Sequence, residues 1–264
     1  MNSDNKIKIS ALVVARNEEI NIKECLNSLS TIDEVILLLD RSTDNTINIA
    51  KNLNCTIYEG NWPSEGIRRN EGIKKCSNDW ILEIDADERA NKELIIEAKN
   101  KISKLKDNTK GYFLIPFDNY IGSKRVRYGW GASWGVSSKP CLFNKNSKMW
   151  GNESIHPSLN LSNKQGFLNN RIDHYVDKNI SDMLKRLDKY TSTKAKDLRK
   201  NPRKIPPLWI TIRRSLTRFY KCYITRKGYK EKGWGFLNAT FAALFVLISY
   251  IKATLEDDNE TPKV

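Results

Sequence analysis

The first 116 residues alternate short apolar runs with amphipathic segments, and this alternation limits the chain to a few architectures. The segments between the runs carry apolar residues at the three-to-four-residue spacing of a helix. The apolar runs are residues 9–15, 34–39, 55–58, 80–84 and 111–116. The second run, EVILLL, is almost wholly apolar, as is typical of a strand buried on both faces of a parallel sheet. The pattern predicts an α/β fold in which helices flank a mostly parallel sheet.

Short polar residues mark where the first helices of this pattern begin. Asn17, Ser42 or Thr43, and Asn91 each precede an amphipathic segment, and a further helix is expected to follow from Ser64. Short polar side chains are suited to accept a hydrogen bond from a backbone N–H group of a helix's first turn. We therefore expect Asn17, Ser42 or Thr43, and Asn91 to cap helices.

The character of the chain changes after this alternating part. Residues 117–172 are rich in Gly, Trp, Ser and Asn, and helical periodicity returns from residue 181 onward. Three prolines between residues 201 and 207 separate that helix from a basic C-terminal stretch. We therefore expect one α/β domain over residues 1–180 and a basic helical extension over residues 181–264.

Positive charge is concentrated in the C-terminal extension. The whole chain has a net charge of +14, and residues 199–232 hold twelve Lys and Arg side chains against one acid, Glu231. An apolar run of 16 residues, 236–251, follows at once. It is shorter than the roughly 20 residues of a bilayer span, so we expect a helix that is buried or lies in a membrane surface. Together these features predict peripheral contact with an anionic membrane and no nucleic-acid partner.

The cysteines and the N-terminus indicate a compartment. The five cysteines are odd in number and contain no CxxC pair, a pattern typical of reduced thiols rather than of disulfides or a zinc cluster. The first ten residues, MNSDNKIKIS, hold no apolar signal core. We expect a cytoplasmic protein that is peripheral on the inner face of the cytoplasmic membrane.

Acidic side chains follow two of the apolar runs at the point where each predicted strand ends. Asp85 and Asp87 come directly after residues 80–84, and Asp40 follows residues 34–39. Because ligands bind at the carboxyl ends of strands in such sheets, we expect these acids on one rim. Two carboxylates one residue apart suit Mg²⁺ or Mn²⁺, which shares its oxygen ligands with phosphates. Asp40 is suited to accept hydrogen bonds from a base or from ribose hydroxyls.

Four segments, ALVVARNEEINIKECLNSL, STDNT, RRNEG and DWILEIDADE, resemble the nucleotide-binding half of family 2 glycosyltransferases, which have the GT-A fold. The resemblance extends over nearly the whole chain to the branch that includes lipopolysaccharide-core glucosyltransferases. Motifs typical of that branch read here Gly129-Trp130, Ile155-His156 and His174-Tyr175. The resemblance implies an inverting, metal-dependent hexosyltransferase that moves a hexose from a UDP-sugar to a glycan or lipid-linked acceptor of cell-envelope polysaccharide.

The resemblance also implies roles for matching residues. Asp87 would bind the metal, Mn²⁺ or Mg²⁺, directly, and Asp85 would lie near both the metal and the ribose. Most relatives carry the base-binding Asp one residue earlier, where this chain has Leu39, so Asp40 is expected to substitute for it. The residues expected to contact the nucleotide-sugar are Ala15, Arg16, Asn17, Glu18, Asp40, Arg69 and Asp85.

The acceptor side departs from the family pattern. Close relatives carry Glu where this chain has Pro157, and often Asp in the region of Ser137. Glu153 and His156, which lie in the loop before Pro157, are therefore the candidate catalytic bases for the acceptor hydroxyl, and Asp118 is an alternative.

Other functions explain less of the sequence. A nucleotidyltransferase also combines a parallel sheet with paired acids, but its first loop is usually rich in glycine, and here that loop reads ARNE. The same absence of GxGxxG argues against a dinucleotide oxidoreductase. A nucleic-acid-binding protein would leave the two acids after residues 80–84 without a role. A catalytically altered protein that binds glycans or nucleotide-sugars stays open, because the usual acceptor-side carboxylates are missing.

Overall fold

The computed structural model describes residues 7–106, 109–130, 137–152, 157–200 and 205–256. The chain forms two compact units, one of residues 1–118 and 138–174 and the other of residues 119–137 and 175–264. The units therefore interleave along the chain, which no pattern in the sequence indicated. The boundary expected at residue 180 stays a prediction.

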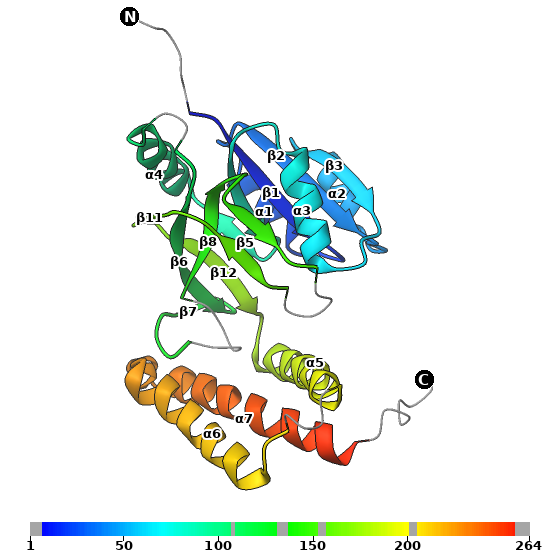
Figure 1. Ribbon diagram of the computed structural model, residues 1–264, viewed down its shortest axis with the longest axis vertical. Coiled ribbons are helices and arrows are strands. Elements are labelled where there is room, and N and C mark those ends of the chain that lie inside the picture. Colours follow the sequence, from blue (N-terminus) through cyan, green and yellow to red (C-terminus); the bar gives the residue numbers. More distant parts are fainter. Residues whose placement is uncertain (1–6, 107–108, 131–136, 153–156, 201–204, 257–264) are drawn as a thin grey trace, which may run out of the picture. The chain divides into compact units, whose positions relative to one another are not determined.

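The sheet of the first unit begins with four parallel strands, β1 (Ile9–Ala15), β2 (Glu34–Asp40), β3 (Thr56–Gly60) and β4 (Trp80–Asp85). They lie in the order β3-β2-β1-β4, and Figure 1 labels the first three of them. All seven residues of β1 are buried, as expected for a strand with a neighbour on each side. The register pairs Ala15 with Leu39 and Val14 with Asp85. The carboxyl ends of β1, β2 and β4 therefore meet at one edge of the sheet.

Later strands complete the sheet, and some of them run antiparallel to their neighbours. They are β5 (Glu88–Ala90), β6 (Tyr112–Ile121), β7 (Lys124–Val126), β8 (Ser138–Asn144), β11 (Lys164–Phe167) and β12 (Ile172–Asp177). The order continues β4-β8-β6-β12-β5, and β8 runs antiparallel to both β4 and β6. A separate ribbon pairs β9 (Lys148–Trp150) with β10 (Leu159–Leu161). The predicted α/β class is confirmed, with a sheet that is parallel in its first four strands and mixed beyond them.

Four helices belong to the first unit: α1 (Ile22–Ser28), α2 (Thr46–Lys51), α3 (Glu65–Lys75) and α4 (Lys92–Ser103). The cap predicted at Asn91 is confirmed, because its side chain accepts a hydrogen bond from Leu94 N. The helix expected from Ser64 is also confirmed, and the Ser64 side chain accepts a hydrogen bond from Ile67 N. The cap expected at Ser42 or Thr43 is wrong, because α2 begins only after Asn45. The cap predicted at Asn17 is wrong. α1 begins five residues later, after Asn21, because Asn17 adopts a left-handed conformation with φ of 55°.

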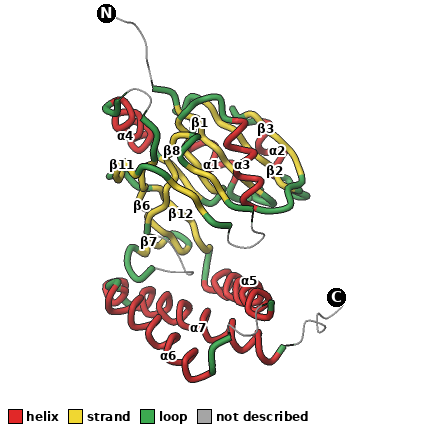
Figure 2. The backbone as a smooth tube through the Cα atoms, viewed as in Figure 1, coloured by secondary structure: helices red, strands yellow, loops and turns green. Residues whose placement is uncertain are grey.

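The second unit is mainly helical (Figure 2). It contains α5 (Ile180–Arg199), α6 (Leu208–Tyr220), a π-helical turn (Lys221–Thr225), a 3₁₀ turn (Gly228–Glu231) and α7 (Gly233–Leu255). Its core packs Trp130, from the inserted segment, with Met183, Cys222 and Phe241. The expected helix over residues 236–251 is thus confirmed and is longer than its apolar run.

α7 contacts both of the other long helices. Arg199 Nη1 donates a hydrogen bond to Lys252 O over 2.7 Å, and Ser215 Oγ donates one to Ala243 O over 2.9 Å. By length and composition α7 would be able to cross a membrane, and a third of its most apolar window is buried within the structure.

Candidate functional site

The acidic motif forms a tight turn at the rim of the sheet. Asp85 ends β4, Ala86 and Asp87 form the turn, and Glu88 begins β5. This turn leaves the Asp87 side chain 36% exposed, whereas Glu88 is almost completely buried. β5 runs antiparallel to β12, which places His174 opposite Glu88. A histidine distant in sequence therefore joins the acids that the sequence singled out.

Asp87 and His174 form the part of the rim that suits a divalent cation. His174 Nε2 lies 3.5 Å from Asp87 Oδ2, and ligand atoms of Asp87, Glu88 and His174 all lie within 4.8 Å of one another. Both oxygens of Glu88 are engaged, one with Lys139 Nζ at 2.6 Å and the other with the backbone N–H of Asp85. One carboxylate and one imidazole fit a metal that takes its remaining ligands from phosphate and water.

Asp85 is held between two cations of the chain. Arg69 Nη2 lies 2.8 Å from its Oδ1, and Lys139 Nζ lies 3.1 Å from its Oδ2. Burial alone would raise the pKa of Asp85, but the charges of Arg69 and Lys139 outweigh it and hold the pKa well below the ordinary range. Asp85 is therefore ionised and fixed in orientation beside Asp87.

Glu88 is a carboxyl at this rim with a raised pKa. Burial raises the pKa of Glu88 to about 7, and the negative charge of Asp85 adds to the rise, while Lys139 opposes it. A glutamic acid in such surroundings changes its charge near neutral pH.

Replacing Glu88 by Gln should make the protein more stable relative to the wild type as the pH rises from about 5 to about 8. In the folded protein Glu88 keeps its proton up to about pH 7, whereas a glutamate in the unfolded chain loses it near pH 4.5. Since the folded state binds more protons between these values, this contribution to wild-type stability is present below them and is lost as the pH rises. Gln does not titrate. Urea unfolding of both proteins across this range measures the difference, and a difference that stays constant or falls would contradict the shifted pKa.

Arg69 lies beneath the rim and connects it to a buried charge network. It is 9% exposed and contacts Glu65, Glu83 and Asp85. Glu83, within β4, is also paired with Lys148 at 3.0 Å. Arg69 thus orients Asp85 from below, and its predicted contact with the nucleotide stays a prediction.

Asp40 lies at the end of β2 among cationic and backbone donors. Arg41 donates to both of its oxygens over 2.8 Å, and Arg68 Nη1 and the backbone N–H of Trp62 approach it at 3.1 Å and 3.4 Å. Burial would raise the pKa of Asp40, but the hydrogen bond from Arg41 leads the effects that lower it below its ordinary value. Asp40 therefore presents an ionised carboxylate at the rim.

The loop after β1 is tied to the loop after β2. Asn17 Oδ1 accepts a hydrogen bond from Thr43 N over 2.8 Å, and Glu18 N donates one to Thr46 Oγ1 over 2.8 Å. The pKa of Glu18 is raised by burial and also by the charges of Asp87 and Asp85, which places Glu18 at the same rim.

The other predicted contacts of this loop differ in exposure. Ala15 is buried at the end of β1, and Arg16 is exposed. Ala15 thus anchors the start of this loop in the core, and Arg16 places an accessible positive charge near Glu18.

The predicted acceptor bases Glu153 and His156 lie outside the described residues. Asp118, the alternative, is buried, and its Oδ1 lies 3.6 Å from Arg171 Nη1. Sequence reasoning assigned no role to His174 or Lys139. His174 had a signal in its His-Tyr motif, whereas Lys139 reaches the rim through the pairing of β8 with β4, which no local pattern reveals.

Comparisons with known proteins agree with this architecture. The model of the family "Glycosyl transferase family 2" matches residues 10–157. An uncharacterized glycosyltransferase of Rickettsia typhi is 30% identical over 210 residues, which are 75% of this chain and 70% of that protein. The lipopolysaccharide core biosynthesis glycosyltransferase LpsC of Rhizobium meliloti is 28% identical over 98 residues, 34% of this chain and 35% of LpsC. The crystal structure of S. aureus TarS residues 1–349 with UDP is 25% identical at a TM-score of 0.41, covering 53% of this chain and 47% of that one.

Proposed function

The chain belongs to glycosyltransferase family 2, and we propose that it moves a hexose from a UDP-sugar to a glycan or lipid-linked acceptor of the cell envelope, with inversion at the anomeric carbon. The observation that carries the proposal is the rim at the end of β4, where ionised Asp85 lies beside Asp87 and His174. The similarity to LpsC, named for lipopolysaccharide core biosynthesis, supports an envelope acceptor.

The nucleotide is proposed to lie across the ends of β1 and β2. The ionised carboxylate of Asp40 is an acceptor for the N–H of a pyrimidine base or for ribose hydroxyls. Arg41, whose side chain is 43% exposed, now holds both Asp40 oxygens, so we expect the nucleotide to replace part of this contact. Arg16, Glu18 and the neighbouring residues Ala15 and Asn17 would border the same pocket.

Asp87 and His174 are proposed to hold the divalent cation, Mn²⁺ or Mg²⁺, with Asp85 beside it. When bound, the cation supplies a positive charge that stabilises the departing diphosphate. Arg69 and Lys139 keep Asp85 ionised and fixed while the donor binds. Removal of the acceptor proton is assigned to Glu153 or His156, which stays a prediction.

A protein that binds the nucleotide-sugar without transferring it is the second candidate. Pro157 favours it, because close relatives carry the acceptor-side carboxylate at that position. Such a protein would bind UDP through the same rim.

The purified protein with Mn²⁺ should release UDP from a UDP-hexose, slowly with water as acceptor and faster with an envelope glycan. EDTA should abolish the release and added Mn²⁺ or Mg²⁺ should restore it, since no step proceeds without charge stabilisation of the diphosphate. Coupled-enzyme detection of UDP measures both rates. UDP binding without any release would support the second candidate, and release that is unaffected by EDTA would contradict the metal assignment.

The enzyme is proposed to work in the cytoplasm, in peripheral contact with the anionic inner face of the membrane. The support lies in α6, which exposes large apolar side chains along one side: Leu208, Trp209, Ile212, Leu216 and Tyr220. A helix that exposes one apolar side to solvent and carries cations on its other side is typical of interfacial helices. Salt-sensitive sedimentation with anionic vesicles tests this contact. Nucleic acid is not among the expected partners.

A further inference from the structure

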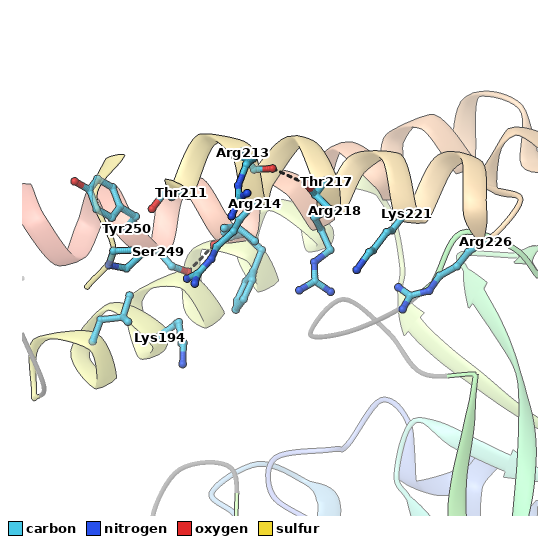
Figure 3. Close-up of a pocket in the computed structure, with 14 residues that line it drawn as sticks. Lys194, Thr211, Arg213, Arg214, Thr217, Arg218, Lys221, Arg226, Ser249 and Tyr250 are labelled. Carbon is cyan, nitrogen blue, oxygen red and sulfur yellow. Dashed lines mark hydrogen bonds between the residues drawn. The ribbon is translucent and has the colours of Figure 1, made fainter. Parts of the chain in front are cut away.

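A strongly basic cavity of about 730 Å³ lies within the helical unit (Figure 3). Residues of α5, α6 and α7 line it, together with residues next to α6. Its charged lining consists of six cations and, among its described lining residues, no acid. The six are Lys194, Arg213, Arg214, Arg218, Lys221 and Arg226.

The helical repeat places Arg214 and Arg218, four residues apart, on one face of α6, and Lys221 follows directly after this helix. Figure 3 shows their charged ends extending into the same space, with Arg226 continuing the row beyond the π-helical turn. Arg214, Arg218, Lys221 and Arg226 thus border one cavity.

Among the residues of this unit that the structure describes, no acid forms an ion pair with this row. The ion pairs of the unit that the structure describes join other cations, Lys185, Arg186 and Lys252, to acids of α5 and β12. Like charges four residues apart destabilise a helix. An anion bound from outside the chain would reduce this repulsion. Thr217 and Ser249, which also line the cavity, donate their hydroxyl hydrogens to backbone oxygens of α6 and α7. The cations are therefore the donors left for a ligand.

The rest of the lining is mostly apolar. It is formed by Leu198, Pro206, Phe245, Val246, the ring of Tyr250, and Thr211, whose hydroxyl donates to Pro207 O. A site that offers guanidinium groups and hydrocarbon surface together fits an amphiphile better than a free ion. Guanidinium forks bind phosphate oxygens in pairs, and the volume lies within the range of small-molecule sites.

We propose that this cavity binds one phosphorylated membrane lipid, with its phosphate at Arg214 and Arg218 and its first hydrocarbon segment against Phe245 and Val246. The inference deepens the proposed function by naming the class of lipid that it acts beside, and it rests on the proposed membrane contact. Arg214 and Arg218 each follow an exposed apolar residue of α6 by two positions, about 200° around the helix. The two arginines therefore lie on the side of α6 opposite its exposed apolar side chains. We expect the cavity on that side to bind one lipid molecule.

Calorimetry with monomeric dihexanoyl phosphatidic acid tests the site without a membrane. We expect the wild type to bind this lipid at least about tenfold more tightly than inorganic phosphate, and dihexanoyl phosphatidylcholine not at all. Arg214→Gln with Arg218→Gln should weaken the binding at least about tenfold. The matched control is Lys189→Gln with Lys196→Gln, which removes the same charge from exposed positions of α5 outside the cavity. It should change the binding by less than about twofold.

Several results would overturn the proposal. They are equal losses in the two double variants, inorganic phosphate bound as tightly as the lipid, and no lipid binding by the wild type. Arg218→Lys, which keeps the charge and removes the fork, should give an intermediate affinity and guards against a double variant that fails to fold. UDP release from a UDP-hexose with water should be the same in all these proteins. A failure of that reaction would count against the proposed transferase and not against the lipid site.

Discussion

Replacing Asp87 by Ala should reduce kcat for sugar transfer at least about a hundredfold while the fold is kept. Asp87 lies in the exposed turn between β4 and β5, and its one described ion pair is to His174 at 3.5 Å. Its removal therefore costs little packing, whereas the proposed cation site loses one of its two proposed side-chain ligands, Asp87 and His174. UDP release at saturating Mn²⁺, with circular dichroism to monitor the fold, measures the effect.

An acid outside the rim provides the control for this variant. Asp79 is 70% exposed and pairs with Lys145, so Asp79→Ala should keep nearly full turnover. His174→Ala should weaken Mn²⁺ binding in the same direction as Asp87→Ala. An Asp87→Ala protein that keeps more than about a tenth of wild-type turnover would place the cation elsewhere, because loss of a direct ligand should cost far more.

Replacing Arg69 by Met should lower the free energy of unfolding by about 3–5 kcal/mol. The guanidinium is buried among Glu65, Glu83 and Asp85. Without it, Glu83 and Asp85 would keep one cationic partner each, Lys148 and Lys139, and part of their buried charge would be uncompensated. Urea unfolding at neutral pH measures the loss.

Lys74 offers the matched control on the same helix. Its side chain is 69% exposed and pairs with Glu71 on the surface, so Lys74→Met should change the free energy of unfolding by less than about 1 kcal/mol. Adding Glu83→Gln to Arg69→Met should restore part of the loss, since it removes the charge that Arg69 compensated. If Arg69→Met unfolds within about 1 kcal/mol of the wild type, the network does not act as the contacts suggest.

The parallel half of the sheet and its acids were predictable because their signals are local. An almost wholly apolar run such as residues 35–39 of β2 predicts a buried strand by itself, and Asp40 and Asp85 follow their runs directly in sequence. Helix starts at Ser64 and Asn91 were equally local. Asn17 failed as a cap because its side chain accepts a hydrogen bond from Thr43, 26 residues away, instead of one from a helix of its own.

The rest of the candidate site depends on pairings between distant segments. Lys139 reaches Asp85 because β8 lies antiparallel beside β4, and His174 reaches Asp87 because β12 lies beside β5. Antiparallel neighbours far apart in sequence leave no periodic signature in either segment. The pKa of Glu88 likewise follows from burial that only the assembled rim provides.

Because the two units interleave along the chain, neither can finish folding until later residues have been synthesised. Residues 119–137 leave the ribosome before the helices that they pack against, so Val126 and Trp130 await Met183 and Cys222 to form their core. The first unit likewise needs residues 138–174, which contribute β8 and β12, to close its sheet. No single cut divides the gene into two self-sufficient halves. A chain stopped near residue 180 would leave Trp130 without its helical partners and would expose apolar surface.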